Sequence, residues 1–165
     1  MMVQQRHRAN GIADASSVTL VTGGGRGVKE AWRFKVILIV LALTLVIFGG
    51  WRLLDPIGFY AFSGLELSND AGPLSEVRGA GGIIMVSGLV VALGAFRHAW
   101  SRTSIVLAAV VFLSLGLARV LGLVLDGFPG AGAIQGMIIE LALGGLALFA
   151  FFTYGGAGAK PGREG

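Results

Sequence analysis

Two charged residues, Arg119 and Glu140, lie inside apolar runs that are each long enough to cross a lipid bilayer. These runs cover residues 103–125 and 131–154. A charge near the centre of a bilayer costs about 3 kcal/mol on insertion scales, so such residues are seldom left without a partner. We therefore expect a membrane protein in which Arg119 and Glu140 are held between helices.

Four apolar runs reach the length of about 20 residues that a helix needs to cross a hydrocarbon core of about 30 Å. They cover residues 32–54, 77–96, 103–125 and 131–154. Only 13% of the 165 residues are charged, whereas soluble domains carry about 25%. Backbone groups within lipid must be satisfied inside the chain, so runs of this length indicate helices rather than strands. The predicted fold is all-α: a four-helix transmembrane bundle formed by residues 32–154.

The distribution of Lys and Arg predicts the orientation of this bundle. Most basic residues precede the first span, lie between the second and third, or follow the fourth. They are Arg6, Arg8, Arg26, Lys29, Arg33, Lys35, Arg97, Arg102, Lys160 and Arg163. The positive-inside rule then predicts cytoplasmic N- and C-termini and places segments 55–75 and 126–130 outside.

Polar segments flank the predicted bundle on both sides. Residues 1–31 are expected to form a flexible, basic cytoplasmic tail, and residues 155–165 a flexible glycine-rich tail. Residues Gly23–Gly27 resemble the phosphate-binding turn of short-chain dehydrogenases. Such a turn works within a βαβ unit, but here a membrane span follows, so we expect no nucleotide binding. We interpret the tail as a basic linker or as the result of a start codon assigned too early.

Five charged residues are expected to share the outer half of the membrane: Glu76, Arg78, Arg119, Asp126 and Glu140. We predict one polar network in which Arg119 bridges Glu140 and either Glu76 or Asp126, because a guanidinium can meet two carboxylates. Glycines one helical turn from the charges leave room for a partner helix: Gly116, Gly136 and Gly144. The sequence leaves three roles open: fixing helix register, binding or transporting a polar or anionic molecule, and proton relay.

The chain offers few residues for enzyme chemistry. It has no cysteine, so a thiolate nucleophile and a thiolate metal site are excluded. Both histidines, His7 and His98, are predicted to be cytoplasmic and therefore far from the intramembrane acids. The formal net charge of +4 does not indicate nucleic-acid binding, because the basic residues flank apolar runs and form no stripe. We expect no enzymatic activity, no cofactor, no metal ion and no nucleic-acid partner.

Short motifs surround the predicted charge network: Asp55-Pro56, Ser75-Glu76-Val77-Arg78-Gly79, Gly81-Gly82, Gly116-Leu117-Ala118-Arg119-Val120 and Asp126-Gly127. With Glu140, they resemble a family of small bacterial four-helix membrane proteins that is known only as a domain of unknown function. The resemblance covers about residues 36–154. It implies four spans and a multi-pass protein of the bacterial inner (cytoplasmic) membrane, but no activity.

Two functional hypotheses follow from the sequence. The first is a small integral membrane protein that acts as an interaction or accessory module, with a structural charge network. The alternative is a transporter or small-molecule binding protein that uses an outward-facing polar pocket. The expected partners are the lipid bilayer and either another protein or further copies of the chain.

Overall fold

The structure is a computed structural model, and it describes residues 31–154 of the chain. The predicted tails, with Gly23–Gly27 and His7, lie outside the described residues. The chain divides into two compact units, Met1–Phe34 and Lys35–Gly165. The second unit contains all but the first four of the described residues.

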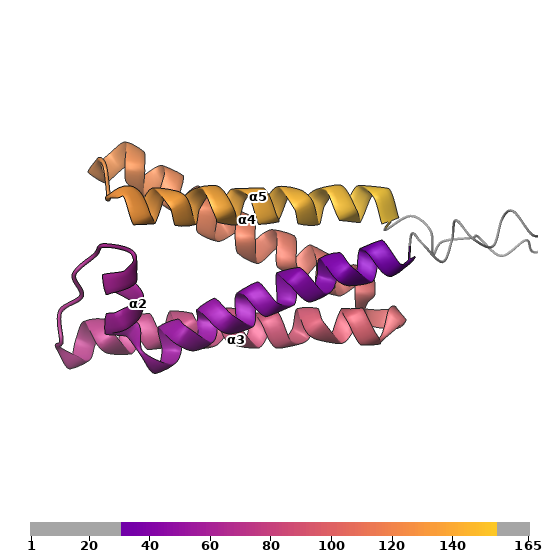
Figure 1. Ribbon diagram of the computed structural model, residues 1–165, viewed down its shortest axis with the longest axis horizontal. Helices are drawn as coiled ribbons and strands as arrows, with labels where there is room; N and C mark the ends of the chain where they lie inside the picture. Colours follow the sequence, from indigo (N-terminus) through magenta and orange to yellow (C-terminus); the bar gives the residue numbers. More distant parts are fainter. Residues whose placement is uncertain (1–30, 155–165) are drawn as a thin grey trace, which may run out of the picture. The chain divides into compact units, whose positions relative to one another are not determined.

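Four helices within the described residues are long and apolar enough to cross a membrane. They are Ala31–Leu54, α3 (Ala71–Phe96), α4 (Ser101–Asp126), which continues from the short 3-10 helix η1 (His98–Trp100), and α5 (Ala131–Tyr154). From Lys35 onward the long helices run lengthwise beside one another (Figure 1). The predicted all-α fold with four apolar helices is confirmed, whereas the orientation of the termini stays a prediction.

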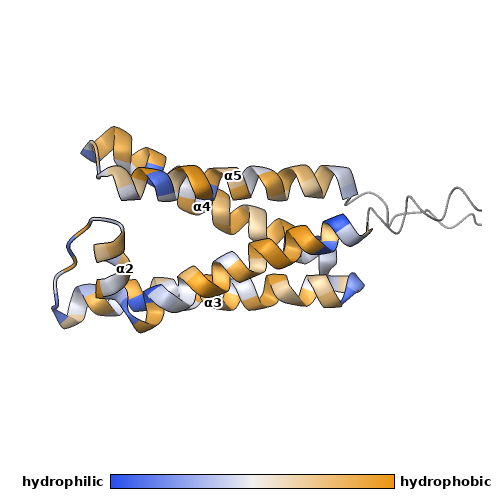
Figure 2. Cartoon of the chain, in the orientation of Figure 1, coloured by the Kyte–Doolittle hydropathy of each residue, from blue (hydrophilic) through white to orange (hydrophobic). Residues whose placement is uncertain are grey.

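Hydrophobic residues predominate along the long helices (Figure 2), and many of them are exposed. Each long helix exposes large apolar side chains over more than half of their surface: Leu43, Ile47, Ile83, Leu121 and Phe152 are examples. Contiguous apolar surface of this kind is unusual for a soluble monomer and marks a site of contact with membrane or protein. Together with the helix lengths, it fits a bundle surrounded by lipid.

Glycines on α3 allow the neighbouring helices to approach closely. A Cβ added at Gly81 would meet backbone atoms of Gly49 and Leu53, and one added at Gly88 would meet Leu45 and Val46. The glycine content of this span therefore has a packing role, as is common where membrane helices touch.

The segment after the first long helix contains a short helix, α2 (Pro56–Phe62), where the sequence analysis predicted only a loop. Asp55 starts this helix because its Oδ1 accepts a hydrogen bond from the Gly58 N–H at 3.0 Å, and Pro56 occupies the first turn. The Asp55-Pro56 pair therefore ends one helix and begins another. The Phe59 ring packs edge-on against Trp51, with 5.6 Å between ring centroids, and this contact holds α2 against the bundle.

Candidate functional site

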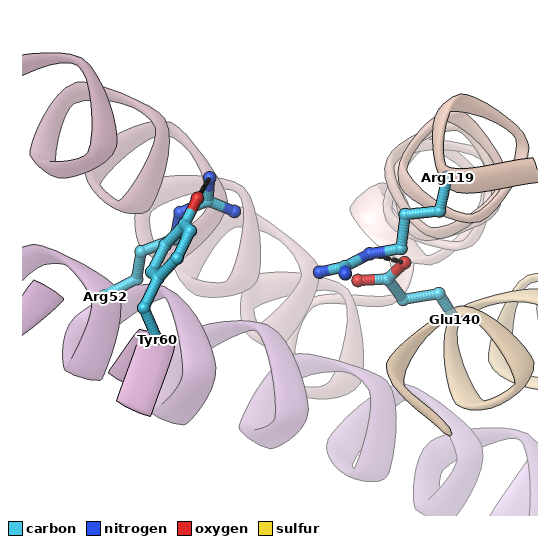
Figure 3. A network of polar contacts seen from close by, with 4 residues as sticks. All are labelled: Arg52, Tyr60, Arg119 and Glu140. Carbon is cyan, nitrogen blue, oxygen red and sulfur yellow. Dashed lines mark hydrogen bonds and ion pairs between the residues drawn. The ribbon is translucent and has the colours of Figure 1, made fainter. Parts of the chain in front are cut away.

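Arg119 of α4 and Glu140 of α5 form an ion pair between two membrane-length helices (Figure 3). The Arg119 Nε lies 2.8 Å from the Glu140 Oε2. Exposed fractions are 31% for the Arg119 side chain and 16% for the Glu140 side chain. This Oε2 accepts no well-aligned hydrogen bond, so the contact is chiefly electrostatic. It is the single ion pair found among the described residues.

Small residues on both helices bring this pair together. A Cβ added at Gly116, one turn before Arg119, would meet Leu141 of α5, and one added at Gly144, one turn after Glu140, would meet Leu113 of α4. At Gly136 an added Cβ would lie 3.8 Å from the Arg119 guanidinium. The glycines therefore let the two helices interlock around the charges and leave space for the guanidinium.

A second guanidinium, that of Arg52, lies near the end of the first long helix. Its Nη2 donates a hydrogen bond to the Tyr60 hydroxyl of α2 at 3.1 Å. Its Cζ lies 5.6 Å from the centroid of the Tyr60 ring and 5.9 Å from that of Phe59, within the range of cation–π attraction. The Nε of Arg52 is buried and has no hydrogen-bond partner.

Two adjacent cavities, which we together call the chamber, connect these charged groups. One has a volume of about 350 Å³ and is bordered by Arg52, Arg119 and Glu140. The other, of about 260 Å³, is bordered by Arg52, Tyr60 and Arg119. In Figure 3 the terminal nitrogens of Arg119 point away from α4, toward the side on which Arg52 and Tyr60 lie. Both cations therefore belong to the wall of one chamber.

The other members of the predicted network lie apart from this pair. Arg78 is exposed, and its Nη1 donates to the carbonyl oxygens of Leu53 and Leu54 at 2.7 and 3.3 Å, which caps the end of the first long helix. Glu76 and Asp126 are exposed and form no ion pair within the described part of the chain. Arg119 therefore meets one carboxylate rather than two.

Arg52 and Tyr60 were not among the five residues of the predicted charge network, although the distribution of basic residues in the sequence pointed to Arg52. Arg52, Arg78 and Arg119 are the basic residues that fall outside the positive-inside pattern. Each of them has a polar partner in the structure: a hydroxyl, two carbonyls and a carboxylate. A basic residue on the unfavoured side of a membrane is thus a useful marker of a specific contact.

The described residues contain no group of three or more His, Cys, Asp or Glu side chains that could hold a metal ion. Four apolar helices of membrane length around a charged chamber define a small multi-pass membrane protein. The family model of the domain of unknown function DUF4345 matches residues 33–151, and the chain belongs to this family. The resemblance found from the sequence motifs is thereby confirmed. No curated protein and no solved structure matches the chain.

Proposed function

We propose that this protein binds a small molecule in the chamber between its membrane helices, the second of the two hypotheses drawn from the sequence. The observation that supports it is the cavity of about 350 Å³ beside Arg119 and Glu140. Protein interiors are close-packed, with few voids larger than a water molecule. Ligand pockets, by contrast, typically measure about 300–1,000 Å³.

An ion pair with a purely structural role does not require such a space. Helix register would be fixed equally well by a pair enclosed in close-packed side chains, as polar contacts between membrane helices commonly are. Here Arg52 and Arg119 both border the chamber together with Glu140. A largely apolar wall with a few convergent polar groups is the usual composition of a ligand site.

Filling the chamber tests the proposal directly. Leu115 borders both cavities, whereas Leu117, two residues along α4, is 59% exposed on the outer surface. The full chain is purified from native membranes in mild detergent, and bound molecules are identified by native mass spectrometry and organic extraction. We expect the wild type and Leu117→Trp to carry the same molecule and Leu115→Trp to carry little of it, with similar thermal stability in all three.

Two results would overturn the proposal. One is a wild-type protein that carries no small molecule, either from its membrane or after incubation with a lipid extract. The other is a Leu115→Trp variant that stays folded and still carries the same molecule in full amount.

The outer face of α3 supports the interaction module as a second candidate. Gly79 and Gly82 have no neighbouring atom within 4 Å of an added Cβ among the described residues, unlike Gly81 and Gly88. Glycines of this kind commonly let a helix of another chain approach. If the wild type forms an oligomer or a complex, native mass spectrometry should detect it, and Gly82→Leu is expected to abolish that species. A wild type that is monomeric and free of partner proteins would contradict this role.

A further inference from the structure

The two arginines on the chamber wall carry hydrogen-bond donors that have no acceptor among the described residues. A guanidinium carries five N–H groups and no acceptor. Arg52 uses one of these groups on the Tyr60 hydroxyl, and its buried Nε has no acceptor. Arg119 directs its Nε toward Glu140, and its terminal nitrogens have no hydrogen-bond partner among residues 31–154. Donors in a site of low polarity are costly to leave unsatisfied, so a ligand rich in acceptor oxygens fits this wall.

The formal charges on the chamber wall are also unequal. Two guanidinium groups, those of Arg52 and Arg119, face one carboxylate, that of Glu140. The acids Glu76 and Asp126 form no ion pair in the part of the chain that is described, so they do not supply the missing negative charge. Since an uncompensated charge is expensive away from water, a single negative charge on a ligand is favoured. Arginine meets carboxylate and phosphate oxygens in a bidentate manner.

Apart from Thr44, Ser63 and Gln135, the rest of the wall of the larger cavity is apolar. It is bordered by side chains from all four long helices: Leu45, Phe48, Ile84, Phe112 and Ile139. These residues form part of the same cavity wall as the two arginines, so one molecule can contact both regions. An inorganic anion would leave the apolar part unfilled, and a hydrocarbon would leave the donors unsatisfied.

We infer that the ligand of this chamber is an amphiphile: an oxyanion, either a carboxylate or a phosphate, attached to an apolar body. This inference rests on the proposed function and specifies its ligand class. The oxyanion lies between Arg52 and Arg119 and accepts hydrogen bonds from their free N–H groups. The apolar body lies along Phe48, Phe112 and Ile139.

Amphiphiles of equal chain length test the ligand class. Dodecanoate, dodecyl phosphate, neutral dodecanol and inorganic phosphate are titrated against the full chain in nanodiscs of zwitterionic phosphatidylcholine, and binding is measured by native mass spectrometry. We expect one or both anionic amphiphiles to bind at least about tenfold more tightly than dodecanol, a ratio that one or two charge-assisted hydrogen bonds provide. Inorganic phosphate alone is expected to bind more weakly than dodecyl phosphate.

A charge-neutralising variant tests whether the preference for anionic amphiphiles arises in the chamber. Arg52→Gln is expected to lower anion affinity about tenfold and to leave dodecanol binding unchanged, whereas Arg52→Lys retains most of the preference because it keeps the charge. Arg97→Gln is the matched control, since Arg97 is exposed and does not border either cavity. If Arg52→Gln fails to fold, the wild-type preference and the Arg52→Lys variant still provide the test.

The alternative outcomes are distinguishable. Equal binding of dodecanol and both anions would overturn the inference and leave the proposed function intact. Inorganic phosphate that binds as tightly as dodecyl phosphate would overturn the apolar part of the inference. The absence of binding by any probe, with no native ligand on the wild type, would overturn the inference and the proposed function together.

Discussion

The two ends of the bundle differ in how polar side chains are arranged between the helices. At the end where α3 meets α4, which we call the serine end, the Ser101 and Ser104 hydroxyls are buried. Ser101 donates to the Gly94 carbonyl of α3 at 2.7 Å, and Ser104 donates to the Val90 carbonyl at 3.0 Å. Small hydroxyl groups are thus satisfied by the backbone of the next helix, and the helices approach closely at Gly94.

Two cations at the serine end, Lys35 and Arg102, lie on aromatic faces instead of between the helices. The Lys35 Nζ lies 5.3 Å from the centroid of the Phe96 ring, and the Arg102 Cζ lies 5.6 Å from that of Phe151. At the opposite end, the chamber end, Arg52 and Arg119 point inward and border a cavity. Both cavities of the chamber lie at the end of the bundle where long charged side chains reach between the helices.

Removal of one charge from the half-buried ion pair is expected to have the largest effect. Arg119→Leu leaves Glu140 without its cation; breaking a fully buried pair typically costs about 3–5 kcal/mol, which is the upper limit here because the Arg119 side chain is 31% exposed. The double variant, with Glu140→Leu as well, removes both charges and should restore most of the stability. Yield of monodisperse protein and thermal unfolding in detergent measure this effect. Equal losses in the single and double variants would show that the chamber end does not depend on this pairing.

Enlargement of a glycine at the serine end should have the next largest effect. A Cβ at Gly94 would lie too close to the Ser104 side chain and near the Ser101 backbone, so Gly94→Val is expected to destabilise the protein by about 1–3 kcal/mol. Gly72→Val on the same helix is the control, because a Cβ at that position would meet no atom within 4 Å. Thermal unfolding compares the two, and equal melting temperatures would mean that this end is less closely packed than the structure shows.

Loss of the buried Ser104 hydroxyl tests how much an interhelical hydrogen bond contributes to stability at the serine end. Ser104→Ala leaves the Val90 carbonyl with its own helical bond only, and interhelical hydrogen bonds in membranes contribute about 0.6 kcal/mol on average. Ser87→Ala serves as the control, because Ser87 bonds to Ile83 within its own helix. We expect a small loss of stability for Ser104→Ala beyond that of Ser87→Ala. A loss no greater than in the control would argue that the serine end is held by packing alone.

A similarly small effect is expected for the cations on aromatic faces. Arg102→Gln removes the contact with Phe151, which is worth about 0.5–1 kcal/mol at an exposed site. Arg97→Gln, at an exposed residue with no such contact, is the reference for charge removal at the same end. Thermal unfolding at low and high salt separates the two contributions. A loss as large as that of Arg119→Leu would contradict the contrast between the two ends.

The sequence predicted the long helices because each is a continuous apolar run, and it predicted a partner for Arg119 because a charge at that depth requires one. The structure places Glu140 in that position. Helix α3 starts at Ala71, six residues before the apolar run of residues 77–96, because its first turns lie outside the continuous apolar run that hydropathy detects. Helix α2 was missed because residues 55–75 were predicted only as a segment between two spans, and a helix of seven residues is too short to show a clear periodic pattern.

The chamber was beyond the reach of sequence patterns for a physical reason. A cavity is the volume that side chains from several helices leave unfilled, and no local pattern encodes that remainder. Arg52 and Tyr60 are eight residues apart and come from different helices. Their contact depends on the turn that Asp55 introduces between them.

Helix α2 contributes wall residues to the chamber although it is only seven residues long. Phe59, Phe62 and the adjacent Ser63 border the larger cavity, while the four long helices carry the lipid-facing surface. Exchange of this short segment can therefore reshape the chamber without altering the framework that spans the bilayer.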